Sequence, residues 1–168
     1  FDIVVSFIGL ILSSPVWFIV IMAVYLEDGR PAFYTQKRIG RREKTFTIIK
    51  FRSMIKQAEN SSGAILAVEH DPRSTRVGRI LRSVAMDELP QLLNILKGEM
   101  SFVGPRSERV EFVLKYNKET PGFNLRFQIR PGLTGVAQIL GRYDSPPKEK
   151  LKYDLWYIEN LSFWLDIY

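Results

Sequence analysis

The chain has 168 residues, enough for one domain with a hydrophobic core, and its 24 lysines and arginines exceed its 18 acidic residues to give a net charge of +6. This basic excess favours an anionic partner, such as a nucleic acid, an anionic lipid or a phosphorylated small molecule. The lack of cysteine and the single histidine exclude disulfides, thiolate zinc sites and metal centres built from several histidines.

The first predicted element is an apolar run over residues 3–26, which contains no charged residue. A helix rises about 1.5 Å per residue, so a helix of this length can cross a hydrocarbon core of about 30 Å. A signal peptide has a shorter apolar region and a small-residue cleavage pattern, which this run lacks. A buried core helix is the alternative, although apolarity on all sides is unusual for a soluble helix. The basic residues that follow the run predict that the rest of the chain lies on the cytoplasmic side.

Ser14-Pro15 lies in the middle of the apolar run. Proline removes one backbone hydrogen bond and clashes with the preceding turn, so we predict a kink or break there. Neighbouring serine hydroxyls can satisfy the carbonyl groups that the proline leaves free, which matters in lipid. The helix then either crosses the membrane with a kink or dips in and returns, and the residues alone leave both paths open.

Residues 33–36 and 45–49 are rich in β-forming side chains, and Gly40 between them favours a turn, so this segment predicts a β-hairpin. A solvated face explains the basic residues of this region, as does contact with anionic lipid headgroups. Lys50 and Arg52 lie close enough together to suggest a phosphate contact. The basic residues of the segment are Lys37, Arg38, Arg41, Arg42, Lys44, Lys50, Arg52 and Lys56.

Residues 59–63 have the composition of a loop, and residues 71–75 predict a turn that caps the next helix. Apolar residues at helical spacing predict this helix over 77–85. Arginine recurs every third residue from Arg73 to Arg82. These arginines either face solvent or lipid, or direct their later members toward the acidic pair that follows.

Asp87 and Glu88 precede Pro90, a residue well suited to the first position of a helix. Apolar residues on one helix face follow, and Gly98 supplies a stop; they are Leu89, Leu92, Leu93 and Leu96. The pair therefore lies at or just before a helix N-terminus, which favours carboxylates and phosphates alike. An isolated acidic pair there is usually a solvated cap. Flanking arginines, including Arg82 and Arg106, instead suit an anionic substrate bridged by a metal.

The last third of the chain predicts helices over 108–118 and 146–160, separated by a glycine- and proline-rich loop over 130–138. The aromatic end, residues 161–168, is typical of a membrane interface, although a core helix would also explain it. The expected fold is α+β, mostly α-helical with a small β-hairpin.

Eight short motifs occur in a fixed order along nearly the whole chain. They are Ser14-Pro15, Gln36-Lys37-Arg38-Ile39-Gly40, Lys50-Phe51-Arg52-Ser53-Met54, Asp71-Pro72-Arg73, Asp87-Glu88-Leu89-Pro90-Gln91, Gly98-Glu99-Met100-Ser101, Val103-Gly104-Pro105-Arg106 and Arg130-Pro131-Gly132-Leu133-Thr134-Gly135. Each motif alone is weak, but the ordered set is specific. Together they resemble the bacterial sugar transferase family, the monotopic phosphoglycosyl transferases.

The resemblance implies an enzyme on the cytoplasmic face of the bacterial inner membrane. Such enzymes move a sugar 1-phosphate from a UDP-sugar to a polyprenyl phosphate, usually undecaprenyl phosphate, and release UMP. The lipid-linked sugar then starts an exopolysaccharide, O-antigen, capsule or glycoprotein glycan. By the same resemblance, residues 1–28 form a re-entrant membrane helix broken at Ser14-Pro15, and residues 29–168 form the catalytic domain with interfacial amphipathic helices.

The resemblance also implies roles for single residues. Asp87 is the expected nucleophile of a phosphosugar-aspartyl intermediate, and Glu88 assists it in Mg²⁺ binding or proton handling. Asp87 must be ionised to attack, and the nearby Arg82 and Arg106 are expected to favour that form. The residues expected to hold the substrate phosphates and the nucleotide are Lys50, Arg52, Arg82, Pro105 and Arg106.

The chain departs from the family pattern at two positions. Ser107 replaces the second proline of a Pro-Arg-Pro motif, which questions the rigidity of the nucleotide contact, and Ala85 stands where members often carry serine. Larger members have further membrane helices and a soluble domain before this region. The ends at Phe1 and Tyr168 therefore predict a catalytic domain without its flanks. Neither the sugar nor a homodimer follows from the sequence.

Rival functions make different demands on the sequence. A metal-dependent glycosyltransferase normally needs an Asp-x-Asp motif, which is absent, and a polytopic phosphotransferase needs more than one apolar segment. A basic membrane-anchored module that binds lipid or nucleic acid would act through charge alone, with a steep salt dependence. Because such a module does not need a nucleophile, Asp87→Asn separates it from the transferase, which takes no nucleic-acid partner.

Overall fold

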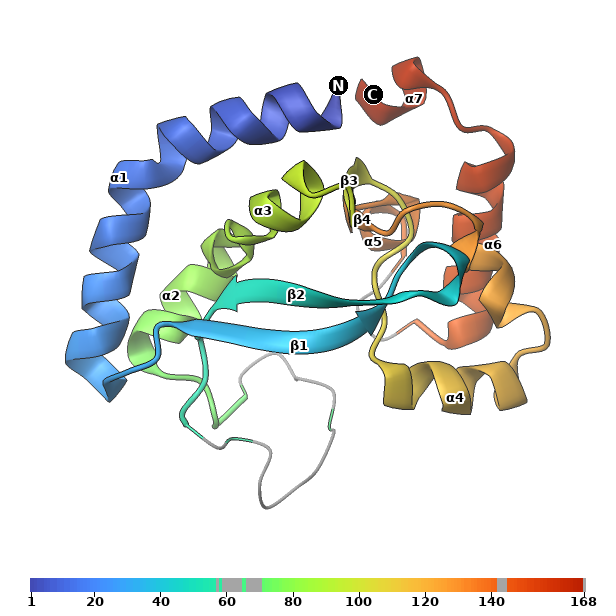
Figure 1. The fold of residues 1–168 in the computed structure, drawn as a ribbon. Helices are drawn as coiled ribbons and strands as arrows, with labels where there is room; N and C mark the ends of the chain where they lie inside the picture. The colour runs from blue at the N-terminus through green and yellow to red at the C-terminus, as the bar shows by residue number, and fades with distance from the viewer. Residues whose placement is uncertain (57, 59–64, 66–70, 142–144, 168) are drawn as a thin grey trace. The chain divides into compact units, whose positions relative to one another are not determined.

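The computed structural model describes residues 1–56, 58, 65, 71–141 and 145–167, and its fold is α+β with mostly helical structure (Figure 1). The helices are α1 (Asp2–Asp28), α2 (Arg76–Ser83), α3 (Gln91–Leu96), α4 (Val110–Glu119), α5 (Val136–Ile139), α6 (Pro147–Glu159) and α7 (Phe163–Ile167). The strands are β1 (Phe33–Ile39), β2 (Thr45–Phe51), β3 (Ser101–Val103) and β4 (Gly132–Thr134). Short 3₁₀ turns form at η1 (Arg41–Glu43), η2 (Met86–Glu88) and η3 (Phe123–Gln128). The fold class is as predicted, and the loop predicted over 59–63 lies outside the described residues.

The chain divides into two compact units. The membrane-helix unit comprises Val4–Thr35 and Ile49–Leu93, and the C-terminal unit comprises Phe1–Ile3, Gln36–Ile48 and Asn94–Tyr168. The predicted hairpin is confirmed as β1 paired with β2, and both strands contribute residues to each unit. Each unit has its own hydrophobic core.

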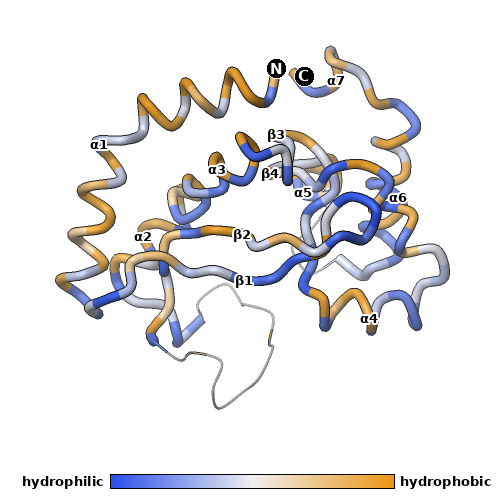
Figure 2. The backbone as a smooth tube through the Cα atoms, in the orientation of Figure 1, coloured by the Kyte–Doolittle hydropathy of each residue, from blue (hydrophilic) through white to orange (hydrophobic). Residues whose placement is uncertain are grey.

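Helix α1 is long and apolar enough to cross a membrane, and Figure 2 shows hydrophobic residues along most of its length. Helical structure continues through Pro15, while Figure 1 shows the ribbon changing direction part way along the helix. Pro15 cannot donate to the carbonyl of Ile11, and the Ser14 hydroxyl donates to that oxygen instead, at 2.8 Å. The predicted compensation by serine is thus confirmed, because this bond satisfies a carbonyl group that lipid could not.

The core of the membrane-helix unit forms against the second half of α1. Val20 and Val24 of this helix pack with Ala32, Phe51 and Leu81, which come from the segment before β1, from β2 and from α2. The contact fixes the end of β2 and the middle of α2 beside the helix. Helix α2 precedes Asp87 and Glu88 in the chain, and β2 carries Lys50, which pairs with Glu88.

Helix α2 confirms the predicted helix over 77–85, and Thr75 caps it by accepting a hydrogen bond from the Gly78 amide at 2.9 Å. Gly78 packs directly on the backbone that follows β2. A Cβ atom placed on Gly78 would lie 1.9 Å from the carbonyl oxygen of Ser53, a distance that requires the backbone to move. The absence of a side chain at this position therefore permits the close approach of α2 to residue 53.

Replacing Gly78 by alanine is expected to lower the free energy of unfolding by about 1–3 kcal/mol, because overpacking forces the backbone apart. The sign is informative, since the same change in an open helix stabilises by about 1 kcal/mol. Chemical denaturation in detergent measures the effect. The control is Ser83→Ala on the exposed side of the same helix, expected to change stability by about 0.5 kcal/mol or less. Equal stability of the Gly78→Ala and wild-type proteins would contradict the close packing.

The C-terminal unit is built around α4, η3 and α6, whose buried apolar residues share one core with Ile39 at the end of β1. Helices α4 and α6 confirm the helices predicted over 108–118 and 146–160. Strand β3 pairs in parallel with β4, with Ser101 opposite Gly132 and Val103 opposite Thr134. This pairing was not predicted, because residues 132–134 lie in the segment expected to be a loop and no strand was expected at residues 101–103.

Candidate active site

Asp87 and Glu88 lie in the short turn η2, between α2 and α3 in the chain. The left-handed backbone of Ala85, with φ of 56°, ends the approach from α2 and redirects the chain into this turn. Such a conformation is unfavourable for a residue with a Cβ atom, by about 1–2 kcal/mol. The prediction that the pair lies just before a helix is confirmed, since α3 begins at Gln91. The predicted end of α3 at Gly98 is also confirmed. The helix ends at Leu96, and Gly98 has a left-handed backbone with φ of 77°.

Asp87 is buried, with 8% of its surface exposed. Burial raises the pKa of this carboxyl above its ordinary value, and Glu88 adds to the increase, while Lys50 and Arg82 oppose it. Arg82 therefore acts in the expected direction, toward the ionised form, whereas Arg106, expected to act likewise, is not among the principal groups that shift the pKa of Asp87. The net direction is nevertheless upward, because the cost of burying the charge exceeds the help from its cationic neighbours.

Lys50 reaches the acidic pair from β2. Its Nζ lies 2.5 Å from Oε1 of Glu88, and only about one sixth of either side chain is exposed. Lys50 was predicted to contact phosphate, and the structure places its ammonium group next to the carboxylates. Arg82, half-buried on α2, donates from Nη1 to the Ser74 hydroxyl at 3.3 Å. The membrane-helix unit thus brings together two carboxylates and two cations, as an anionic substrate requires.

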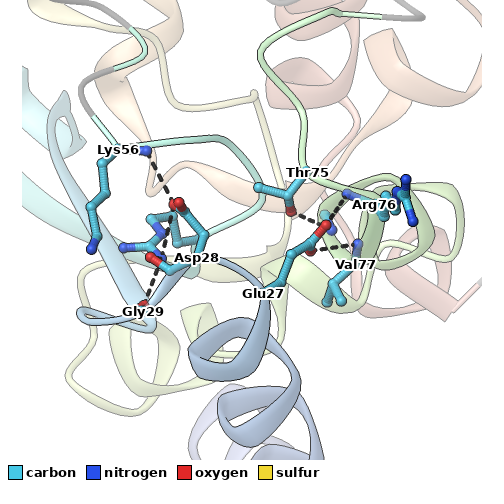
Figure 3. A network of polar contacts seen from close by, with 9 residues as sticks. Glu27, Asp28, Gly29, Lys56, Thr75, Arg76 and Val77 are labelled. Atoms are coloured by element: carbon cyan, nitrogen blue, oxygen red, sulfur yellow. Dashed lines mark hydrogen bonds and ion pairs between the residues drawn. The ribbon is translucent and has the colours of Figure 1, made fainter.

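Arg52, also predicted as a phosphate ligand, is directed toward the end of α1. Its Nη2 donates to the carbonyl oxygens of Gly29 at 2.7 Å and Asp28 at 3.0 Å, and lies 3.2 Å from the Asp28 carboxylate. The residue is 6% exposed. Figure 3 shows Asp28 and Gly29 and, beside them, a second contact in which Glu27 meets the first residues of α2. In the sequence, the only signal for Glu27 and Asp28 was their position after an apolar run.

Pro105 and Arg106 belong to the C-terminal unit, and hydrogen bonds hold their backbone on both sides. The Pro105 carbonyl accepts from the Gly132 amide at 2.9 Å, and the Arg106 carbonyl accepts from Nη2 of Arg126 at 3.0 Å. Arg38 donates to the carbonyl of Ser107, also at 3.0 Å. These three bonds constrain the segment where Ser107 replaces a proline.

Arg126 is itself held in a buried ionic network. Its guanidinium lies 2.7 Å from the Asp154 carboxylate and 3.6 Å from that of Glu108, and its face packs on the ring of Phe123. Burial raises the pKa of Asp154 to about 6, although Arg126 opposes this shift. The network makes the backbone of Arg106 dependent on three charged side chains that do not face solvent.

The acidic pair was also predicted to hold Mg²⁺. Within the described part of the chain, no group of three or more histidine, aspartate or glutamate side chains could enclose a metal ion. Mg²⁺ in phosphate-transfer sites is held by one or two carboxylates, with water and substrate phosphates completing the shell. Asp87 and Glu88 fit that smaller demand, in which the substrate supplies further oxygens.

The sequence profile of the family described as bacterial sugar transferase matches residues 1–168. The chain is 39% identical to UDP-N-acetylgalactosamine-undecaprenyl-phosphate N-acetylgalactosaminephosphotransferase of Aeromonas hydrophila, over 99% of this chain and 40% of that protein. It is 42% identical to UDP-glucose:undecaprenyl-phosphate glucose-1-phosphate transferase of Escherichia coli K12, over 99% of this chain and 37% of that protein. An uncharacterized sugar transferase of Bacillus subtilis, EpsL, is 39% identical, and 80% of its length is matched.

The chain therefore spans about two fifths of the length of the first two relatives. The names of these two relatives specify different sugars, and a further relative from Salmonella typhimurium is an undecaprenyl-phosphate galactose phosphotransferase with 37% identity. Similarity at this level accordingly indicates the family without identifying one sugar.

Proposed function

We propose that this chain, which belongs to the bacterial sugar transferase family, transfers a sugar 1-phosphate from a UDP-sugar to undecaprenyl phosphate and releases UMP. The observation that carries the proposal is the buried Asp87 beside Glu88, with Lys50 and Arg82 as cationic neighbours. A carboxylate in such a setting can attack phosphorus while the cations attract the diphosphate.

In the proposed first step, an Oδ atom of Asp87 attacks the phosphorus that bears the sugar. The new Oδ–P bond forms as the bond to the bridging oxygen of the diphosphate breaks, and the electron pair leaves with UMP. In the second step, an oxygen of undecaprenyl phosphate attacks the same phosphorus and restores the Asp87 carboxylate. Two displacements of this kind divide one difficult transfer into two easier ones.

Lys50 and Arg82 have electrostatic roles in this scheme. Both favour the ionised form of Asp87 against the effect of burial. Their positive charge also suits the charge that moves onto the leaving phosphate. Glu88 pairs with Lys50 and thereby holds the ammonium group next to the nucleophile. Asp87 and Glu88 would also hold Mg²⁺, which when bound neutralises diphosphate charge.

Helix α1 gives the proposed enzyme its membrane attachment. A path that enters the bilayer and returns at the Ser14-Pro15 bend would leave residues 29–168 on the cytoplasmic face of the inner membrane. The UDP-sugar and the phosphate of the lipid acceptor are both accessible there. This arrangement is supported by the apolar length of α1 and by the basic residues that follow it.

The direct test is UMP release from a panel of UDP-sugars in the presence of Mg²⁺ and without a lipid acceptor. We expect one equivalent of UMP per enzyme for the cognate sugar, because the covalent step does not need the acceptor. Removal of the metal with EDTA is expected to abolish the release. A strict requirement for polyprenyl phosphate in this half-reaction would contradict the covalent route, and the absence of release with every sugar would contradict the proposed function.

Replacing Lys50 by methionine is expected to lower kcat/KM for UMP release by about 10²-fold, as for the loss of one group that stabilises developing charge. The change removes a cation that supports ionised Asp87 and leaves Glu88 without its ion-pair partner. Lys97→Met removes an exposed lysine beyond α3 and serves as the control. Equal kcat/KM values for the two variants would exclude an electrostatic role for Lys50.

A further inference from the structure

The last two residues of α1 contact the start of α2 and the segment that follows β2 (Figure 3). Glu27 meets the start of α2, and Asp28 meets the segment that follows β2. Helix α2 leads to Asp87 at its far end, whereas β2 carries Lys50, the partner of Glu88. All of these residues belong to the membrane-helix unit.

Glu27 completes the cap of α2. Its two carboxylate oxygens accept from the backbone amides of Arg76, at 2.6 Å, and Val77, at 2.8 Å, while Thr75 satisfies the amide of Gly78. The first N–H groups of a helix have no partner within the helix and carry partial positive charge. A carboxylate supplied by α1 thus satisfies two amide groups of α2 and complements the charge at that end.

Asp28 provides the second connection. Its carboxylate lies 3.2 Å from Nη2 of Arg52 and accepts from the backbone amide of Lys56, also at 3.2 Å. The Arg52 guanidinium donates to the carbonyl of Asp28, the last residue of α1, and to that of Gly29, which follows the helix, and so closes the helix end. Arg52 lies one residue beyond β2 and two residues from Lys50, so the contact fixes the strand end near the ion pair with Glu88.

The two connections also meet each other. The carbonyl oxygen of Ser53 accepts from the Thr75 amide at 3.2 Å, and Gly78 packs against the same residue. Helix α2 and the end of β2 are therefore joined directly and are both attached to α1. A displacement of the end of α1 would be transmitted to Asp87 through α2 and to Lys50 through Arg52.

We propose that Glu27, Asp28 and Arg52 are positioning residues that couple the end of the membrane helix to the geometry of the Asp87–Glu88 pair. The proposal rests on the transferase function given above. It assigns to Arg52 a role different from the phosphate contact that the sequence suggested. A cap that merely stabilised the fold would change the amount of folded protein and leave the turnover of each folded molecule unchanged.

The test uses the full chain in lipid nanodiscs that contain undecaprenyl phosphate, so that the enzyme turns over. Glu27→Gln is the variant, and Glu159→Gln, an exposed acid of α6, is the control. We expect kcat for UMP release per folded molecule to fall by about tenfold, because small misplacements of reacting groups have large effects on rate. KM for the UDP-sugar should stay within about twofold of wild type, because no group that binds the substrate has been removed. Hydrogen–deuterium exchange should become faster at residues 76–77 and also at residues 84–89.

Unchanged kcat in Glu27→Gln would overturn the proposal, as would faster exchange confined to residues 76–77. Asp28→Asn provides the same test through the other connection if Glu27→Gln does not fold. A wild-type protein that releases no UMP would contradict the transferase function instead. The exchange measurement at residues 84–89 would then still decide whether the end of α1 is coupled to the acidic pair.

Discussion

Asp87→Asn is expected to lower the rate of UMP release by about 10⁴-fold or more, as removal of an attacking nucleophile does in other enzymes. Asparagine has nearly the shape of aspartate, but its amide cannot form the bond to phosphorus that the proposed mechanism requires. Because Asp87 is buried and its pKa is raised, the neutral side chain suits the site at least as well as the charged one. The variant should therefore fold normally and be inactive.

Three measurements make this result specific. UMP release is assayed beside thermal unfolding, so that a loss of activity is not confused with a loss of folded protein. Glu88→Gln is included as a neighbouring change and should retain more activity, because in the proposed mechanism Glu88 holds Lys50 and Mg²⁺ but does not itself attack phosphorus. Binding to anionic vesicles should be the same for Asp87→Asn and wild type. Full turnover by Asp87→Asn would contradict the role of Asp87 as the nucleophile. Vesicle binding without UMP release by either protein would instead favour the charge-based binding module.

The elements that could be predicted are those whose signals are local. Helix α2 has apolar residues at helical spacing and a threonine at its cap, and the hairpin has two β-rich runs separated by a short turn. Strands β3 and β4 have three residues each, too few to display a period, and they pair across a long intervening segment. Their pairing depends on tertiary contacts that no local pattern contains.

The candidate site shows the same division between local and distant information. The motif around Asp87 and Glu88 was visible in the sequence, as was the arginine spacing that includes Arg82. Lys50 and Arg52 appeared equivalent there, being two residues apart. They differ in the structure because β2 ends at Phe51, and the Arg52 amide then donates to the Ala32 carbonyl, at 2.8 Å, near the end of α1.

Glu27 illustrates why the connection to α1 could not be predicted. Its partners, Arg76 and Val77, lie 49 and 50 positions later in the chain. An acid after an apolar run is an ordinary feature of a membrane-proximal segment, and nothing near it in sequence indicates a helix cap. The contact follows only from the core that places α2 beside α1, through Val20, Val24 and Leu81.

The second large effect is expected from Arg126→Leu, which should lower the free energy of unfolding by about 3–5 kcal/mol at pH 8. The change removes the cation from a buried network. Asp154, which is only 2% exposed, then lacks its ion-pair partner. The carbonyl of Arg106 also loses its hydrogen-bond donor. We therefore expect weaker binding of UMP in addition to the loss of stability, because the backbone of the proposed nucleotide contact is released.

The pH dependence separates this mechanism from a simple packing defect. The pKa of Asp154 is already raised to about 6, and loss of Arg126 must raise it further. Folding of the variant then takes up protons between the unfolded and folded pKa values, so its stability falls as pH rises through that window. Urea titrations at pH 5 and pH 8 should give the smaller loss at pH 5.

Arg126→Leu combined with Asp154→Leu should recover stability at pH 8, because the uncompensated charge is removed. A loss that is equal at both pH values would indicate that the cavity left by Arg126, and not the buried carboxylate of Asp154, causes the destabilisation.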